Sequence, residues 1–442
     1  MKKNTRKSHW TRKSGKIEPL FHLTFVSPSR VSTLYFRTTD TSLYEMHANI
    51  SEPFQLSPAN GAQHFFGYYG ISPWNANMSR FVCLETTFHD RMPDPGDEAS
   101  IICIDTASGE HEVIATTRGW NFQQGTMLHW LPSSPERKII FNDCDKDRAF
   151  SRVMDVESGE TWELPRPINA VAKHANLAAC VSFTRLRKYR RVTSLPCANE
   201  YSKGGVHPDD DGIFLMDIED GSLDLIVSLD DIWKANPATL ALPEDDFKAM
   251  GMGLWFNHVS FNPSGSRLHF LARYPNIFGG LVTSMWTIDK NGMNPHLLVD
   301  FYHRLSHFEW VNDRRLIVTM DWPDPKHKSH VMMEDLDDAA EAGWTPVAPE
   351  TLTKDGHPAV SPSKKLMATD TYIVDGRRYV YLVDLATHEV MEIHSFDNPA
   401  MYNKEVRCDP HCRWSPDGSL LCFDALVDGS TRQILAVRVE ND

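Results

Sequence analysis

The amino-acid sequence predicts an all-β protein, a seven-bladed β-propeller whose last blade is closed by a strand from the N-terminal region. The chain has 442 residues, which exceeds the usual size of a single hydrophobic core and favours either several domains or a repeat. A unit of roughly 45–70 residues recurs along the chain, within the range that is typical of propeller blades. Helical patterns are few, with a mixed segment at 223–235 and a short candidate at 335–342.

The clearest mark of the repeat is an apolar run that ends in aspartate and is usually followed by a glycine. The run is typical of a buried strand, and the glycine allows a tight hairpin into the next strand. Examples are 101–105 with Gly109, 152–155 with Gly159, 213–217 with Gly221, 285–289 with Gly292, and 380–384.

Counted by their first strands, the predicted units are 64–118, 119–167, 168–237, 250–302, 303–354, 355–399 and 404–442. The last unit has three strands, so we expect an early strand from residues 21–50, which include the strand-like run 31–37, to complete it. We expect a basic flexible tail at 1–20 and a single propeller at 21–442. A pair of β-sandwiches would not explain regular units from end to end.

The charge of the chain restricts its partners. A formal net charge of −14 argues against nucleic acid as the main ligand, because a phosphate backbone requires a basic face. A small acidic substrate is compatible with it, since a local group of cations can bind one. The basic tail contains no apolar segment of a secretory signal. It is interpreted as a solvated tail, with a nucleic-acid or membrane-contact arm as the alternative.

The sequence also predicts a cytoplasmic protein without a membrane partner. No stretch reaches the ~18 consecutive apolar residues that span a bilayer. The eight cysteines lie mostly in apolar strand patterns such as 81–84 and 420–423. This placement predicts buried, reduced thiols rather than a disulfide framework.

Four histidines occupy one register of consecutive units, each four residues before the turn that follows the first strand. They are His258, His307, His357 and His411, and they precede Asn262, Val311, Ser361 and Ser415. Histidine makes up 20 of 442 residues, so chance gives four such matches with a probability on the order of 10⁻⁴. First strands of a propeller line its central channel, so we expect these imidazoles to converge on one divalent metal ion. Asp409 points the same way along the strand and is expected to add a carboxylate. The alternative is a structural hydrogen bond for each ring within its own blade.

Other side chains are candidates for catalysis or substrate binding. In the aromatic cluster at 63–75, His64 and Tyr68 suit acid–base chemistry or sugar stacking, with core packing as the alternative. Tyr68 lies four residues before Ser72. The basic run 183–191, which includes Arg185, suits a clamp for a carboxylate or phosphate, with a solvated charged surface as the alternative. Arg273 and Arg413 are further candidates, with ion pairing as the alternative.

A mixed zinc site that combines His411 with Cys408 and Cys412 is disfavoured. The two cysteines lie on the opposite face of the strand from His411.

Residues 64–438 resemble the oligogalacturonate lyase family, seven-bladed propellers of the pectate-lyase-22 type. The resemblance rests on motifs in the same order along the chain. These are His258 with Asn262-Pro263, Met-Trp-Thr-Ile-Asp-Lys-Asn-Gly at 285–292, Ser-His-Phe-Glu-Trp at 306–310, Gly356-His357, and Asp-Pro-His-Cys-Arg-Trp-Ser-Pro-Asp at 409–417.

The resemblance implies a divalent ion in the channel, with Mn²⁺ expected and Ca²⁺ or Zn²⁺ as alternatives. It implies ligands at His307 and His411, and Asp409 stands where the family has a histidine. The family's glutamine ligand falls near Val406, which cannot bind a metal, so His357 or His258 is expected to replace it.

The resemblance also implies a proton-abstracting arginine at a position that is Ser284 here. Another group must therefore act as the base, and the options are Arg273, Arg185, His64 and Tyr68.

Together these observations predict a metal-dependent polysaccharide or oligosaccharide lyase that cleaves a uronate-containing saccharide by β-elimination. Its expected partner is a small acidic oligosaccharide. The alternatives are a non-catalytic propeller that binds a glycan or a protein, and a metal-dependent hydrolase or epimerase acting on sugars.

Overall fold

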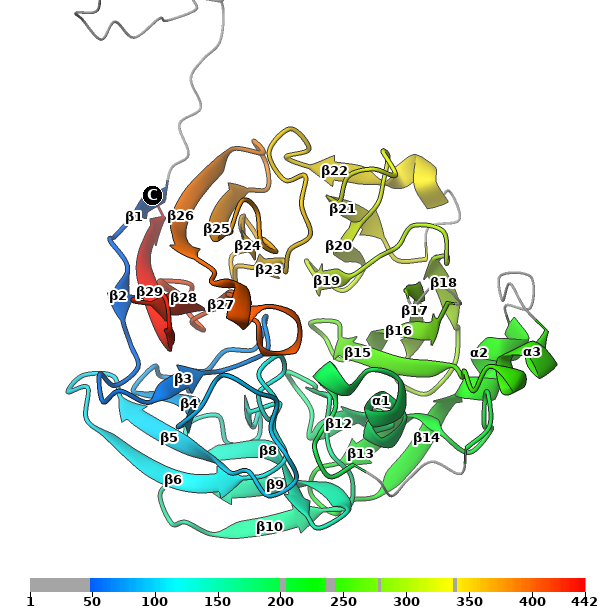
Figure 1. Cartoon of the computed structure of the whole chain (residues 1–442), viewed down its shortest axis with the longest axis horizontal. Coiled ribbons are helices and arrows are strands. Elements are labelled where there is room, and N and C mark those ends of the chain that lie inside the picture. The colour runs from blue at the N-terminus through cyan, green and yellow to red at the C-terminus, as the bar shows by residue number, and fades with distance from the viewer. Residues whose placement is uncertain (1–47, 199–203, 236–242, 277–279, 337–339, 442) are drawn as a thin grey trace, which may run out of the picture. The chain divides into compact units, whose positions relative to one another are not determined.

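The computed structural model describes residues 48–198, 204–235, 243–276, 280–336 and 340–441. Within these residues the strands form seven antiparallel sheets arranged in a ring, as the sequence predicts (Figure 1). The predicted tail at 1–20 and the strand-like run 31–37 lie outside the described residues.

Blades 1 to 3 follow the chain in order. Blade 1 contains β3 (Gln63–Phe65), β4 (Arg80–Thr86), β5 (Ala99–Asp105) and β6 (His111–Thr117). Blade 2 contains β7 (His129–Trp130), β8 (Lys138–Asp145), β9 (Arg148–Asp155) and β10 (Thr161–Leu164). Blade 3 contains β11 (Ala170–Val171), β12 (Leu177–Cys180), β13 (Gly212–Asp217) and β14 (Leu223–Ser228).

Blades 4 to 6 repeat this pattern. Blade 4 contains β15 (Trp255–Phe261), β16 (Arg267–Pro275), β17 (Leu281–Asp289) and β18 (His296–Val299). Blade 5 contains β19 (His307–Trp310), β20 (Arg315–Met320), β21 (Ser329–Glu334) and β22 (Thr345–Val347). Blade 6 contains β23 (Ala359–Val360), β24 (Leu366–Asp370), β25 (Arg377–Asp384) and β26 (Val390–Asp397).

Blade 7 is completed from the other end of the chain. It contains β27 (Arg413–Trp414), β28 (Leu420–Val427) and β29 (Thr431–Asn441), with β1 (Ala48–Ile50) and β2 (Phe54–Gln55) on its outer edge. Both N-terminal strands pair with β29, Ile50 opposite Val439 and Phe54 opposite Ala436. The predicted closure by an early strand is therefore confirmed.

The short helices lie in connections between strands. They are α1 (Phe183–Tyr189), η1 (Arg191–Thr193), α2 (Leu229–Ala235), α3 (Glu244–Ala249), η2 (Ala340–Gly343), η3 (Ala400–Tyr402) and η4 (Lys404–Val406). The segment 223–235 divides into β14 and α2. Helix α1 forms within the basic run, where Ser182 caps its start by accepting a hydrogen bond from the backbone N–H of Arg185 at 3.4 Å. No described helix has the length and apolar character required to cross a membrane.

The hairpins form as the aspartate–glycine pattern predicts. In blade 1 the side chain of Asp105 accepts from the backbone N–H of Ser108 at 2.8 Å, and Gly109 donates to the Asp105 carbonyl at 2.8 Å. Gly109 has φ of +75°, a conformation that a glycine adopts without strain. Strand β5 before this turn is largely buried and belongs to the core, whereas β6 after it is largely exposed, so the turn sets the register between a core strand and an outer strand.

The cysteines depart in part from the prediction. Cys144 and Cys197 form a disulfide, with Cα atoms 6.0 Å apart, so the expectation of reduced thiols is wrong for this pair. Cys197 does not lie in a strand but follows η1, and it contacts Cys144 at the end of β8. No periodic sequence pattern indicates this contact between two distant segments. The free cysteines among the described residues are buried.

Candidate functional site

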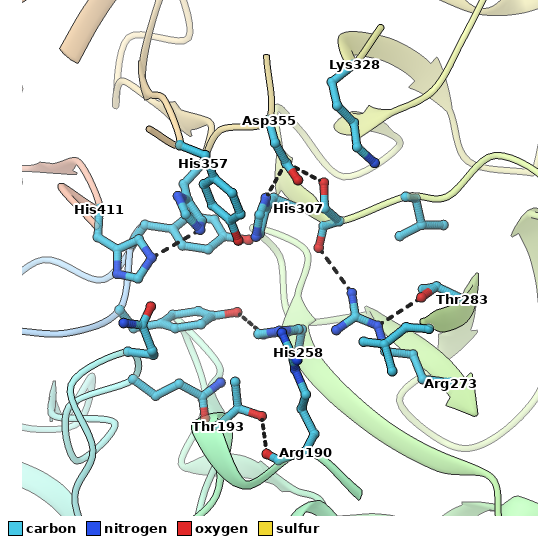
Figure 2. A pocket seen from close by; sticks show the side chains of 18 of the residues that line it. Arg190, Thr193, His258, Arg273, Thr283, His307, Lys328, Asp355, His357 and His411 are labelled. Carbon is cyan, nitrogen blue, oxygen red and sulfur yellow. Dashed lines mark hydrogen bonds and ion pairs between the residues drawn. The ribbon is translucent and has the colours of Figure 1, made fainter. Parts of the chain in front are cut away.

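A cavity of about 260 Å³ lies where the first strands and their entry loops meet, and side chains from all seven blades or their connecting segments line it (Figure 2). Tyr68 and Tyr69 come from blade 1, and Gln123 and Gln124 from blade 2. Blades 4 to 7 contribute the four histidines of the predicted register. The segment 190–193, between β12 and β13, adds Arg190 and Thr193.

The histidine register has a backbone cause. In each of four consecutive blades, the residue four positions after the histidine donates its N–H to a carbonyl at the start of the next strand, at 2.8 to 2.9 Å. The donors are Asn262, Val311, Ser361 and Ser415. Equivalent hydrogen bonds start at Asn75, Leu131 and Ala172 in blades 1 to 3, so the matching positions there hold Ile71, Met127 and Ile168. The turn of blade 1 is thus anchored at Asn75, not at Ser72, and Tyr68 reaches the cavity from the loop before the register position.

His357 and His411 form the tightest pair of the cluster. Their Nε2 atoms lie 3.1 Å apart. Nδ1 of His357 contacts Asp370 Oδ1 at 2.8 Å, and Nδ1 of His411 contacts the carbonyl oxygen of Gly67. A carboxylate and a carbonyl only accept hydrogen bonds, so both Nδ1 atoms carry a proton, and in a neutral ring Nε2 then presents a lone pair. Two lone pairs that face each other at this distance repel unless a cation or a proton lies between them.

A divalent ion fits this arrangement. Nitrogens that share a metal at ~2.1 Å lie ~3.0 to 3.4 Å apart, for right-angle to tetrahedral geometry. Metal-binding histidines also fix their second nitrogen by donating to a carboxylate or backbone carbonyl, as these two do. Burial lowers the pKa of His411 well below its ordinary value, and the neighbouring His357 lowers it further. The ring is therefore neutral, as a ligand must be.

His307 lies beside this pair. Its ring centroid is 3.9 Å from that of His357, and the centroid of His357 is 4.1 Å from that of His411. Its Nδ1 contacts Asp355 Oδ1 at 3.0 Å, so Nε2 is the ring nitrogen that could bind a metal. Burial and the neighbouring His357 lower the pKa of His307 to about 4, so this ring is also neutral at pH 7.

Asp409 is buried next to the pair and is held by two arginines. Ligand atoms of His357, Asp409 and His411 lie within 4.8 Å of one another. Arg378 Nη1 lies 2.6 Å from Asp409 Oδ1, and Arg407 Nε lies 2.7 Å from Oδ2. Burial alone would raise the pKa of Asp409, but Arg407 and Arg378 hold it well below its usual range.

His258 differs from the other three histidines because its partner is a phenol. The hydroxyl of Tyr68 lies 2.9 Å from Nδ1 of His258. Burial and then the positive charge of Arg273 lower the pKa of His258 well below its ordinary value, so the neutral ring accepts a hydrogen bond from the Tyr68 hydroxyl. Burial raises the pKa of Tyr68, which keeps its hydroxyl protonated. The Tyr68 carbonyl accepts from Arg413 Nε at 2.7 Å, and Arg413 is ion-paired with Asp424.

Arg273 enters the cavity beside the position where the resemblance implies an arginine. Ser284 on β17 is buried and accepts from Trp286 Nε1 at 3.0 Å. On the adjacent β16, Ala272 lies opposite Ser284 and Arg273 opposite Thr283. The guanidinium donates to Thr283 Oγ1 at 3.2 Å and to the Ser306 carbonyl at 3.3 Å (Figure 2). Burial and the nearby charge of Arg190 lower the pKa of Arg273 to about 10.

Two predicted catalytic residues do not reach the cavity. His64 is fully buried, with Nδ1 3.0 Å from Gln433 Oε1 and Nε2 2.9 Å from Glu85 Oε2. Arg185 is also buried, and its guanidinium donates to the carbonyls of Leu254 and Val206, both at 2.9 Å. Both side chains hold structural elements together, so their ring and guanidinium groups are occupied.

The sequence pattern did not indicate several residues that line the cavity, namely Gln123, Gln124, Asp355, Tyr372 and Arg407. They lie in irregular connections, where no strand or helix period marks a side chain. Asp355 offered one signal, because it stands two residues before His357. Arg190 belongs to the basic run, but the sequence did not distinguish it from its neighbours.

The fold is shared with oligogalacturonate lyases of known structure. The enzyme from Vibrio parahaemolyticus is 11% identical, with a TM-score of 0.57 over 89% of this chain and 97% of that one. An oligogalacturonate lyase in complex with manganese is 12% identical, with a TM-score of 0.61 over 89% of this chain and 96% of that one. The expected distant resemblance is confirmed at the level of the fold.

The same fold also occurs in peptidases. A prolyl endopeptidase is 13% identical, with a TM-score of 0.51 over 86% of this chain and 50% of that one. No protein-family model matches the sequence, and no curated protein matches it. The fold therefore does not assign the reaction, and the side chains of the cavity must support it.

Proposed function

We propose that this protein is a divalent-metal-dependent lyase that cleaves a short uronate-containing saccharide by β-elimination. One observation carries the proposal: one cavity combines an imidazole cluster that fits a cation with arginines that suit carboxylates and a tyrosine held by a histidine. The likeness to oligogalacturonate lyases of known structure supports it.

The cavity is cationic although the chain is acidic. Arg190, Arg273 and Arg407 line it together with Lys328. The Nε of Arg190 has no hydrogen-bond partner among the described residues. Planar guanidinium groups bind carboxylates through paired hydrogen bonds, so these side chains suit the uronate groups of a substrate. Gln124, whose side-chain amide is likewise unpartnered there, suits sugar hydroxyls.

We assign proton abstraction to Arg273. Its pKa of about 10 gives it a larger neutral fraction than an ordinary arginine has, and a neutral guanidine accepts a proton. The hydrogen bonds to Thr283 and Ser306 hold the group in place. A divalent cation bound at the imidazoles would withdraw charge from the uronate carboxylate and acidify the C5 proton.

We assign protonation of the leaving oxygen to Tyr68. Its raised pKa keeps the hydroxyl protonated, as a general acid requires. The 2.9 Å contact with His258 orients that hydroxyl. His64 and Arg185 take no part, because their polar groups are bound within the fold.

The direct experiment incubates the metal-loaded protein with a panel of uronate oligosaccharides and follows the ultraviolet absorbance of an unsaturated uronate. We expect the absorbance to rise with wild type, to be lost with Arg273→Ala, and to be retained with Arg315→Ala, whose exposed side chain pairs with Glu334. New reducing ends without the absorbance would indicate a hydrolase and overturn the proposal. Saccharide binding without a product would indicate a binding propeller and also overturn it.

A further inference from the structure

We propose that His307, His357 and His411 form an imidazole-only site for a borderline divalent transition ion such as Zn²⁺ or Co²⁺, with Asp409 outside the coordination sphere. The resemblance to the lyase family implies a different set of ligands, in which Asp409 binds the metal and the ion is Mn²⁺. In that set His357 is one of two residues, with His258, that could replace the family's glutamine ligand. The proposal concerns the cavity of the proposed function, but it depends on the contacts of the histidines and not on the reaction.

The hydrogen-bond partners of the three rings support the first step. Each Nδ1 faces an acceptor: Asp355 for His307, Asp370 for His357 and the Gly67 carbonyl for His411. In a neutral ring Nε2 is then the nitrogen that can bind a metal. This is the outer-sphere pattern of metal-binding histidines, repeated on strands or loops of three consecutive blades.

The position of His357 supports the second step. Its ring lies between the other two, with centroid distances of 3.9 Å to His307 and 4.1 Å to His411. Its Nε2 is the atom that faces Nε2 of His411 at 3.1 Å. His357 is only 3% exposed, so water has little access to this contact. A ligand role for His357 relieves the repulsion between the two lone pairs.

The carboxylates near the site are already engaged. Both oxygens of Asp409 lie within ion-pair distance of arginines, Oδ1 2.6 Å from Arg378 and Oδ2 2.7 Å from Arg407, and Oδ2 also accepts a hydrogen bond from Arg407 Nε. A dication bound to Asp409 would stand next to both guanidinium groups. Asp355 and Asp370 are bound to the Nδ1 atoms. Nitrogen donors remain, and imidazole suits Zn²⁺, Co²⁺ and Ni²⁺, whereas Ca²⁺ and Mg²⁺ prefer oxygen.

His258 provides the matched control. It belongs to the same register and lines the same cavity, but its Nδ1 faces the Tyr68 hydroxyl instead of a carboxylate or carbonyl. The proposal therefore predicts that replacing His258 leaves the metal in place, whereas replacing His357 removes a ligand.

The test is proton NMR of the Co²⁺-loaded full chain in water. Each histidine ligand bound through Nε2 gives one exchangeable, hyperfine-shifted Nδ1–H signal. We expect three such signals in wild type, in His258→Ala and in Asp409→Asn. Two signals in wild type, or loss of the metal from Asp409→Asn that remains folded by circular dichroism, would overturn the proposal.

Affinity provides the second measurement. Loss of an outer-sphere partner alone costs 10- to 100-fold, so we expect His357→Ala to weaken Zn²⁺ binding by more than about 100-fold, as measured by chelator competition. If His357→Ala does not fold, His357→Gln keeps a donor for Asp370 and serves instead. Unchanged Zn²⁺ affinity in the folded variant, or Ca²⁺ binding as tight as that of Zn²⁺, would contradict the proposal.

The two proposals fail separately. Three shifted signals without lyase activity would leave the imidazole site standing and contradict the proposed function. Lyase activity with only two histidine ligands would leave the proposed function standing and contradict the site of three imidazoles.

Discussion

The carboxylate of Asp370 holds both members of the central histidine pair. Its Oδ1 accepts from Nδ1 of His357 at 2.8 Å, and its Oδ2 accepts from the backbone N–H of His411 at 2.9 Å. One buried side chain from β24 thus fixes the ring of one ligand and the backbone of the next blade. This coupling explains how histidines from two neighbouring blades keep their nitrogens face to face.

Asp370→Asn is therefore expected to weaken metal binding 10- to 100-fold, because the amide no longer fixes the His357 ring as strongly. Chelator competition measures the change. Asp384→Asn is the matched control, since Asp384 caps an exposed turn with its side chain and does not line the cavity. Equal affinity in both variants would show that Asp370 has no role in orienting the ligand.

Tyr68→Phe removes the hydroxyl that faces His258. We expect kcat on the uronate substrate to fall by about 10² to 10⁴, the usual contribution of a general acid, with little change in metal content. Tyr69→Phe is the matched variant, because Tyr69 stacks on Tyr68 with ring centroids 4.8 Å apart. A similar loss in both variants would show that the effect is not specific to the Tyr68 hydroxyl and would contradict its role as the acid.

The pH dependence of the reaction reports on Arg273. The guanidine acts as a base only when it is deprotonated, and its pKa is lowered to about 10. The rate should therefore rise with pH up to about 10 in wild type. In Arg273→Lys, the profile should move with the pKa of the new amine. A profile that is flat from pH 7 to 10 in wild type would exclude Arg273 as the base.

The disulfide tethers the segment that brings Arg190 and Thr193 to the cavity. Cys144 and Cys197 are 53 residues apart in the chain. For a loop of this length the chain-entropy model gives about 4 kcal/mol of stabilisation, so Cys144→Ser should lower the free energy of unfolding by up to about that amount. Urea unfolding with and without reductant measures it. Reductant should destabilise wild type and leave Cys144→Ser unchanged, and the reverse would contradict the pairing.

The ring of blades could be predicted from the sequence because each repeat shows a local pattern of apolar and turn residues. The runs that end at Asp105 and Asp155 combine a buried strand with a hairpin, and this pairing needs no knowledge of distant residues. The histidine register was accessible for the same reason, since each turn fixes the same backbone hydrogen bond four residues after the histidine.

The partners of the candidate site were less accessible. Asp370 and Arg378 lie next to the site only because the strands of blade 6 are paired in the folded protein. Cys197 forms a disulfide with Cys144 only because the segment that contains Cys197 packs against blade 2. His64 and Arg185 have side chains that suit catalysis or substrate binding. In the folded protein, however, His64 contacts Glu85 and Arg185 donates to the Val206 carbonyl. Sequence pattern indicates which residue types recur, whereas the choice among them depends on contacts between blades.

The central claim is that a cation held by the histidine cluster is required for β-elimination. The most direct measurement compares the ultraviolet absorbance of unsaturated product from chelator-treated protein, from the same protein reloaded with a divalent ion, and from His357→Ala/His411→Ala. We predict no product from the stripped protein, recovery on reloading, and no recovery in the double variant. Product formation by the stripped protein at the rate of the reloaded protein would contradict the claim.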